Sequence, residues 1–230
     1  QPPSWHLACV ECGTTYLGLE LRYLCDCSAT LDVIHDLDAC NLTREILDSR
    51  LASKNPLDRS GVWRFRELIL PLGDETLSNI AVTRGEGSTQ LYDASLVGSE
   101  IGLSNLWLKH EGENPTGSFK DRGMTAGITI AKHLGMKAVA CASTGNTSAS
   151  MASYAAISGL EAIVFIPEGK IAFGKLSQAL AYGAKTIQIE GDFDDAMALV
   201  QEVCASEGIY LVNSINPFRI EGQKAIVFEI

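Results

Sequence analysis

Short apolar runs alternate with segments of helical periodicity through the second half of the chain. Runs typical of buried strands lie at residues 137–142, 162–166, 186–189 and 210–212. Apolar spacing typical of helices lies between them, at residues 148–158, 173–182 and 194–206. Strands that alternate with helices form βαβ units with a parallel sheet. We therefore predict an α/β fold of the open parallel-sheet βαβ type, with residues 137–213 forming a compact sheet of their own.

The helix predicted at residues 194–206 has the clearest boundaries. Met197, Val200 and Val203 lie on one stripe at helical spacing. Asp192 stands near its start and Gly208 just past its end, where a capping carboxylate and a glycine are favoured. We interpret the acidic residues at its start and the lysines Lys170 and Lys175 as solvated charges.

The first half of the chain has weaker patterning. A strand is predicted near residues 105–109, and residues 62–70 are predicted to pack as a short apolar segment. Residues 36–58 are polar with scattered apolar positions, so we expect a connection there. Another helix is expected from about residue 219.

Composition narrows the class of protein. Apolar residues make up 46% of the chain and charged residues 20%, as in a globular protein. No apolar run approaches the roughly 20 residues that span a bilayer, so we expect no membrane partner. The net charge of −10 argues against a nucleic-acid partner, which requires clustered Lys and Arg. A small anionic substrate remains compatible with this charge, because it needs only a few local donors.

Four cysteines near the N-terminus, Cys9, Cys12, Cys25 and Cys27, have the spacing of a four-thiolate zinc site. The gap between Cys25 and Cys27 is tighter than usual, and Ser28 stands where such a turn usually has glycine. A vestigial ribbon or ordinary free thiols are the alternatives. The odd total of seven cysteines favours a reducing compartment over a disulfide framework.

Lys120 follows a turn predicted at Pro115 and Gly117. Ser118 and Asp121 have the spacing of a capping pair that opens a helix, which places Lys120 in its first turn. The positive end of the helix dipole disfavours a cation there. Lys120 is therefore inclined to be a neutral amine, the form that a covalent nucleophile requires. Taken alone, the residue is better explained as a solvated surface lysine beside a turn.

Three segments carry a family resemblance. Residues 114–123 read Asn-Pro-Thr-Gly-Ser-Phe-Lys-Asp-Arg-Gly, residues 142–150 read Ala-Ser-Thr-Gly-Asn-Thr-Ser-Ala-Ser, and residues 212–224 begin Val-Asn-Ser-Ile-Asn-Pro-Phe-Arg. In this order, with the N-terminal cysteines, they resemble the fold type II pyridoxal-phosphate enzymes of the tryptophan-synthase-β type, and among these the threonine synthases. One departure is Gln90, where that family usually has proline, which would stiffen the turn.

The resemblance implies roles for particular residues. Lys120 would hold pyridoxal 5′-phosphate covalently, with Phe119 and Asn146 as further cofactor-binding residues. The implied substrate-binding residues are Ser143, Thr144, Thr147, Asn213, Ser214 and Arg219. A guanidinium such as that of Arg219 suits a substrate phosphate because its planar donors bind two oxygens at once. Hydroxyl residues at a helix start also serve as ordinary helix caps, so this alternative stays open for Ser143, Thr144 and Thr147.

The implied reaction is the conversion of O-phospho-L-homoserine and water to L-threonine and phosphate, a γ-elimination followed by β-addition of water. The first alternative is a sister enzyme such as a cysteate synthase or a threonine dehydratase. A more remote one is a non-catalytic zinc-ribbon binding module.

The expected organisation has two lobes behind a small zinc-ribbon-like segment. We expect that segment at residues 1–35, the part of the large lobe with the cofactor lysine at 36–136, a small mobile lobe at 137–213 and a return to the large lobe at 214–230. Both ends look cut, so we expect the chain alone to bind cofactor weakly and the full-length protein to be a homodimer. The expected location is the cytoplasm, or a plastid if a leader precedes Gln1.

Overall fold

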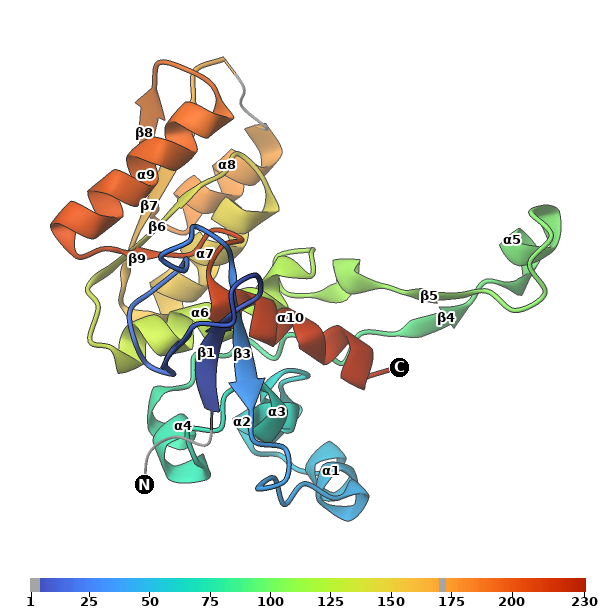
Figure 1. The fold of residues 1–230 in the computed structure, drawn as a ribbon. Coiled ribbons are helices and arrows are strands. Elements are labelled where there is room, and N and C mark those ends of the chain that lie inside the picture. Colours follow the sequence, from blue (N-terminus) through green and yellow to red (C-terminus); the bar gives the residue numbers. More distant parts are fainter. Residues whose placement is uncertain (1–4, 170–172) are drawn as a thin grey trace.

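A parallel four-stranded sheet dominates the second half of the computed structural model, which describes residues 5–169 and 173–230 (Figure 1). Its strands, in the order β8-β7-β6-β9, are β6 (Ala138–Ala142), β7 (Glu161–Pro167), β8 (Lys185–Ile189) and β9 (Tyr210–Leu211). All three neighbouring pairs are parallel. The predicted α/β fold with a parallel sheet is therefore confirmed, and each predicted strand is present.

Helices cover both faces of this sheet. They are α7 (Asn146–Ser158), α8 (Phe173–Ala181) and α9 (Phe193–Glu207). Successive residues of a strand point to opposite faces. Ala140 and Ala142 of β6 accordingly pack with α9, whereas Val139 and Cys141 belong to the larger core that includes α7.

The caps of α9 are those expected from its sequence. The Asp192 carboxylate accepts hydrogen bonds from the backbone N–H groups of Asp194 and Asp195. The Asp195 carboxylate in turn accepts a hydrogen bond from the Asp192 N–H. Gly208 ends the helix with a left-handed φ of 66°.

Two helices at the centre of the molecule lie unusually close together. They are α6 (Lys120–His133) and α10 (Pro217–Phe228). A Cβ on Gly222 of α10 would lie 2.1 Å from the backbone oxygen of Arg122, and one on Gly123 of α6 would lie 2.6 Å from the backbone oxygen of Arg219. Only glycine permits this approach, so these positions set the distance between the two helices.

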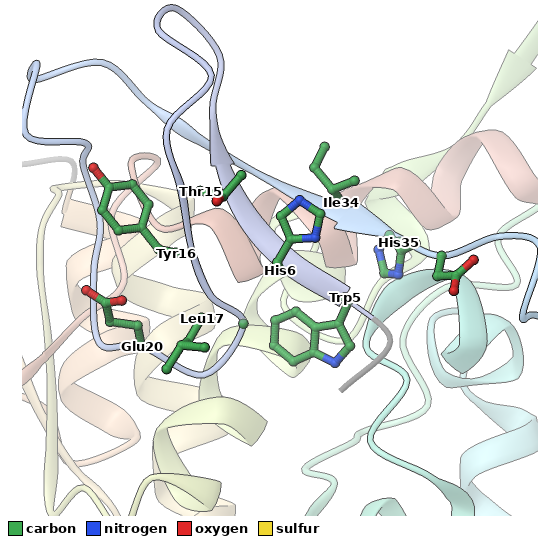
Figure 2. A pocket seen from close by; sticks show the side chains of 10 residues that line it. Trp5, His6, Thr15, Tyr16, Leu17, Glu20, Ile34 and His35 are labelled. Carbon is green, nitrogen blue, oxygen red and sulfur yellow. The ribbon is translucent and has the colours of Figure 1, made fainter. Parts of the chain in front are cut away.

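An antiparallel sheet of three strands, in the order β2-β1-β3, forms the N-terminal segment. Its strands are β1 (Trp5–Cys9), β2 (Thr15–Leu17) and β3 (Leu31–His35). One face, with Trp5, Leu7 and Val33, is buried in the main core. The other face is open to solvent at His6, which lines a hollow of about 900 Å³. Figure 2 shows the side chains that line this hollow.

The polar stretch at residues 36–58 is more ordered than the predicted connection, since it contains two short helices. They are α1 (Arg44–Leu51) and α2 (Pro56–Arg59), capped by the side chains of Thr43 and Asn55. The predicted packing segment follows as a 3₁₀ turn, η1 (Trp63–Phe65), and α3 (Arg66–Ile69), with Trp63 fully buried. Helix α4 (Asp74–Ile80) follows α3 in the chain.

An arm extends away from the body (Figure 1). It consists of β4 (Leu91–Asp93), α5 (Ser95–Glu100) and β5 (Trp107–Lys109), the last within the predicted strand, and it returns through the 3₁₀ turn η2 (Glu111–Glu113). At its base the Gln90 N–H donates to the Glu113 carboxylate at 2.7 Å. Proline has no N–H, so the departure at Gln90 gains a hydrogen bond that the proline of the resembled family could not make.

Across the described residues, no helix combines the length and the apolar character needed to cross a bilayer.

The substitution Gly222→Ala should lower the free energy of unfolding by roughly 1–3 kcal/mol, because the added methyl group meets backbone that cannot move aside. Urea unfolding measures this change. Gly174→Ala in α8 is the matched control, because nothing lies within 4 Å of its added Cβ. An unchanged or raised stability of Gly222→Ala would contradict the close-packing argument.

Candidate active site

Lys120 is the first residue of α6, as the sequence predicts. The Ser118 hydroxyl accepts a hydrogen bond from the Lys120 N–H at 3.3 Å. The other half of the predicted capping pair is wrong, because the Asp121 carboxylate turns toward Thr116. It accepts from the Thr116 N–H at 2.7 Å and from the Thr116 hydroxyl at 2.6 Å.

The fully buried carboxylate of Asp121 joins the lysine turn to α7. The Ser150 hydroxyl in the second turn of α7 donates to the same Asp121 oxygen that Thr116 uses. Lys120 precedes Asp121 in the chain, and Asn146 begins α7. This contact therefore draws the two predicted cofactor segments together.

The amine of Lys120 lies in an environment that favours its neutral form. Burial, followed by the nearby positive charge of Arg219, lowers the pKa of Lys120 below its ordinary 10.5. The amine lies 4.2 Å from the centre of the Phe119 ring and makes no hydrogen bond or ion pair with the described residues. The direction agrees with the sequence prediction, but the causes are burial and Arg219 rather than the helix dipole.

Arg219 is a buried cation with unused donors. Its side chain is 1% exposed, and one terminal nitrogen donates to the Val212 carbonyl at 2.5 Å. The Nε atom and the other terminal nitrogen have no hydrogen-bond partner among the described residues. Burial lowers the pKa of Arg219 to about 10, partly opposed by the thiol of Cys141. A buried guanidinium with two free donors is suited to an anion, and the alternative of a surface charge is excluded by its burial.

Asn213 and Ser214 differ from Arg219 in the hydrogen-bonding groups that they leave available to a ligand. The Asn213 amide is engaged at both ends by Ala142, accepting from its N–H at 2.9 Å and donating to its carbonyl at 3.0 Å. Asn213 therefore holds the end of β6 to the segment after β9. Ser214 is exposed, and its hydroxyl is free to meet a ligand.

The start of α7 has few side-chain caps. Its N-cap Gly145 has no side chain, and the Ser143 hydroxyl accepts from the Gly145 N–H at 3.1 Å. Asn146 is exposed, and no side-chain hydrogen bond of Thr144 or Thr147 is present in the described part of the chain. The Ser143 hydroxyl thus satisfies the amide of the N-cap residue, while the first amides of α7 remain available to an anion.

Lys175 is a contact that sequence reasoning missed. Its ammonium donates to the Thr116 carbonyl at 3.0 Å, so α8 rests on the turn before Lys120. The prediction of a solvated Lys175 is therefore wrong. No local sequence pattern indicates this contact. Lys170 lies outside the described residues.

A buried ion network supports the opposite side of the same turn. Arg122 bonds to Glu111 at 2.7 Å and to Glu229 at 2.7 Å, and Lys109 joins Glu229 at 2.7 Å. Burial alone would raise the pKa of Glu229, but the hydrogen bonds from Arg122 and Lys109 lower it instead. The network fixes the end of α10 against the base of the arm.

The four N-terminal cysteines converge. Their sulfur atoms all lie within 4.8 Å of one another, with separations of 3.5 Å for Cys9–Cys27, 3.5 Å for Cys12–Cys25 and 3.7 Å for Cys12–Cys27. Four thiolates at about 2.3 Å from a tetrahedral zinc would lie about 3.8 Å apart. The arrangement therefore fits a zinc ion.

Each of the two turns around these cysteines contains a residue with a positive φ. Gly13 has a φ of 72° and Ser28 a φ of 69°. Ser28 thus adopts the left-handed conformation for which the sequence lacks a glycine. The hollow of Figure 2 lies on the other end of this segment and contains none of the predicted site residues.

The geometry defines a class of protein before any comparison. An open α/β sheet brings together a helix-opening lysine with a lowered pKa and a buried arginine with free donors, as expected of an enzyme that attaches a cofactor through an amine. Residues 82–230 match the family model described as "Pyridoxal-phosphate dependent enzyme". The chain belongs to this family.

Two relatives are similar over most of the chain. A threonine synthase of Methanocaldococcus jannaschii is 50% identical over 222 residues, which is 96% of this chain and 52% of the relative. A threonine synthase of Methanosarcina acetivorans is 50% identical over 227 residues, 98% of this chain and 53% of the relative. The chain thus spans about half the length of the curated relatives it matches.

Solved structures share the fold. Diaminopropionate ammonia lyase of Escherichia coli aligns with a TM-score of 0.58 and 18% identity, covering 64% of this chain and 48% of that chain. Threonine deaminase isoform 2 of Solanum lycopersicum aligns with a TM-score of 0.54 and 20% identity, covering 82% of this chain and 46% of that chain.

Replacing Arg219 by glutamine should raise the pKa of Lys120, because it removes the positive charge that opposes protonation of the amine. At a fixed pH below that pKa, Lys120 should then react more slowly with acetic anhydride, as followed by peptide mass spectrometry. Lys132 is exposed on the same helix and serves as the internal control. Equal or faster labelling of Lys120 in the folded variant would contradict the electrostatic link.

Proposed function

We propose that this chain carries the cofactor and substrate residues of a threonine synthase, which converts O-phospho-L-homoserine and water to L-threonine and phosphate. The observation that carries the proposal is a buried Arg219 with two unpaired donor nitrogens, on a helix that packs closely against the helix opened by Lys120. The first residue suits a phosphorylated substrate and the second suits covalent attachment of pyridoxal phosphate. The relatives at 50% identity support the same reaction.

Each site residue has a role in this proposal. Pyridoxal phosphate, when bound, supplies the electron-withdrawing ring that makes protons at Cα removable. Lys120 would hold the cofactor, then move protons at the substrate carbons as a neutral amine. Phe119 would pack against the cofactor, and Asn146 would donate a hydrogen bond to it from the start of α7.

The substrate residues divide by what they contact. Arg219 and Ser214 would bind the substrate phosphate, while Ser143, Thr144 and Thr147 with the free amides of α7 would bind the carboxylate. Asn213 would act by holding these strands in place. The proposal includes two lobes, a large one formed by residues 36–136 and 214–230 and a small one formed by residues 137–213. The hydrogen bond from Lys175 to the Thr116 carbonyl joins the two lobes.

The alternatives predict different sites. A sister enzyme such as a cysteate synthase or threonine dehydratase would share Lys120 and Asn146, but a threonine dehydratase substrate has no phosphate for Arg219 to bind. A non-catalytic zinc-ribbon module gives no reason for the lowered pKa of Lys120 or for the unused donors of Arg219.

We further propose that Cys9, Cys12, Cys25 and Cys27 hold one structural zinc ion. The sulfur separations of 3.5–3.7 Å support it, as do the left-handed turns at Gly13 and Ser28. All seven cysteines are free thiols, so these four are available as ligands. A homodimer and a cytoplasmic or plastid location remain predictions.

The full-length protein, expressed with pyridoxal phosphate and given O-phospho-L-homoserine, should release phosphate and L-threonine in equal amounts. Lys120→Ala should lower both by about a hundredfold or more, because it removes the attachment point and the proton carrier. Borohydride reduction, which makes the covalent link permanent, should place the cofactor on Lys120 in peptide mass spectra. Lys132→Ala is the control and should keep full activity.

Other outcomes identify the alternatives. Phosphate without threonine would contradict the proposal in favour of an elimination-type relative. A cofactor on Lys120 with neither product would indicate a sister enzyme with another substrate, which phosphoserine and threonine would then test.

Zinc analysis of the purified protein should find one ion per chain. Cys12→Ser and Cys27→Ser should each lose it and lower the melting temperature, because removing one thiolate opens the tetrahedral site. Cys40→Ser, which changes a thiol outside the cluster, should keep the ion. A metal content that is equal in all three variants would contradict the site.

A further inference from the structure

Residues 210–221 carry Arg219 and link the parallel sheet to α10. We name them the anion-binding segment. It runs from β9 through Asn213 and Ser214 into the first turns of α10. The N-terminal segment, residues 5–35, lies against it, and Figure 1 shows β1 and β3 beside α10. Three separate contacts join the two segments.

The first contact is at β9. The Leu211 N–H donates to the Tyr23 hydroxyl at 2.8 Å, and the Tyr23 ring meets Tyr210 edge-on at 5.8 Å. Among the described strands, β9 is an edge of its sheet, so this N–H lacks a partner strand. The Tyr23 hydroxyl satisfies it and fixes the position of the strand that leads to Asn213.

The other two contacts flank Arg219. Trp5 and His35 are paired in register on β1 and β3, and Figure 2 shows both at the same end of the sheet. The Trp5 ring meets Phe218 edge-on at 5.9 Å. The His35 Nε2 lies 2.9 Å from the Glu221 carboxylate, whose side chain has no exposed surface. Phe218 and Glu221 are respectively one residue before and two residues after Arg219.

The direction of the Arg219 donors depends on this support. The guanidinium has a single hydrogen bond within the described chain, to Val212, so its own contacts do not fix where Nε and the free nitrogen point. Gly127 of α6 leaves room for the aliphatic stem of Arg219, because a Cβ there would lie 3.1 Å from its Cγ. The N-terminal segment holds the backbone on either side of it from another direction. A site of this kind binds well only when its supporting residues are themselves held.

We propose that the N-terminal segment acts as a positioning module for the anion-binding segment, with Tyr23, Trp5 and His35 as its positioning residues. None of them touches substrate. They fix the backbone on which Arg219 and Ser214 stand, and so set the affinity for the phosphate of the ligand. This inference rests on the proposed phosphate-binding role of Arg219. It assigns the N-terminal segment a supporting role in that site.

The experiment uses inorganic phosphate as the probe, titrated calorimetrically into the purified chain. Tyr23→Phe removes a single hydroxyl, and His35→Ala removes the imidazole. Each should weaken phosphate binding about three- to tenfold, the range expected from one buried hydrogen bond. His35→Gln, which can still donate to Glu221, should recover part of the affinity. Tyr92→Phe is the matched control, because it removes a hydroxyl bonded to Glu113 on the distant arm.

Hydrogen exchange adds a readout that needs no ligand. Tyr23→Phe and His35→Ala should speed amide exchange in residues 210–221, whereas Tyr92→Phe should leave that segment unchanged. A contact that stabilised only the N-terminal segment would speed exchange within residues 5–35 alone, and that result would overturn the inference.

Arg219→Ala separates this inference from the function on which it rests. If Arg219→Ala abolishes phosphate binding while Tyr23→Phe and His35→Ala leave it unchanged, the positioning role is wrong and the phosphate site stands. If Arg219→Ala itself leaves phosphate binding unchanged, both the proposed phosphate site and its positioning are overturned.

Discussion

The close approach of α6 and α10 is the constraint on which the site depends. Lys120 opens α6 and Arg219 lies in the first turn of α10, so the distance between these helices sets the distance between the two cations. Gly123, Gly127 and Gly222 make the approach possible, since a methyl group at any of them would meet the facing helix within 3.1 Å. Glycine costs stability inside a helix, by roughly 1 kcal/mol relative to alanine. Here that cost is offset by a geometry that no larger residue allows.

The charge of Arg219 also acts on Lys120. Burial and the charge of Arg219 lower the pKa of Lys120, and burial lowers the pKa of Arg219 to about 10. A lowered pKa favours the neutral amine of Lys120, which is the state that covalent attachment of a carbonyl compound needs. The arginine stays charged and keeps two donors free for an anion. One juxtaposition thus prepares both groups.

The sequence predicted the parts of this arrangement that depend on local chemistry. The strands of the parallel sheet, the caps of α9 and the position of Lys120 at the start of a helix follow from periodicity and capping residues, and the structure has them. It could not predict contacts between distant segments. Asp121 was assigned to Ser118 because that pairing is local, yet Thr116 and Ser150 compete for the carboxylate once α7 folds against it.

Lys175 and Asn213 illustrate the same limit from opposite sides. The sequence around a single lysine near a helix start does not show whether its ammonium is solvated or bonded to a distant carbonyl, as that of Lys175 is to Thr116. Asn213 was predicted from resemblance to bind phosphate, but its amide is engaged by Ala142, which only the paired strands place within reach. The sequence pattern predicts only a connection at residues 36–58, because α1 and α2 are too short to produce a clear helical period.

The N-terminal segment extends this reasoning from single residues to a whole element. A sheet with three short strands buries little apolar surface, so it needs the main core on one face and, in our proposal, zinc at one end. Trp5 and His35 lie on the strand ends that meet α10, and Tyr23 lies on the loop between the cysteine pairs. Whatever orders the cysteines therefore also orders the contacts with residues 210–221. On this reasoning, the stability of this segment and the position of Arg219 are coupled.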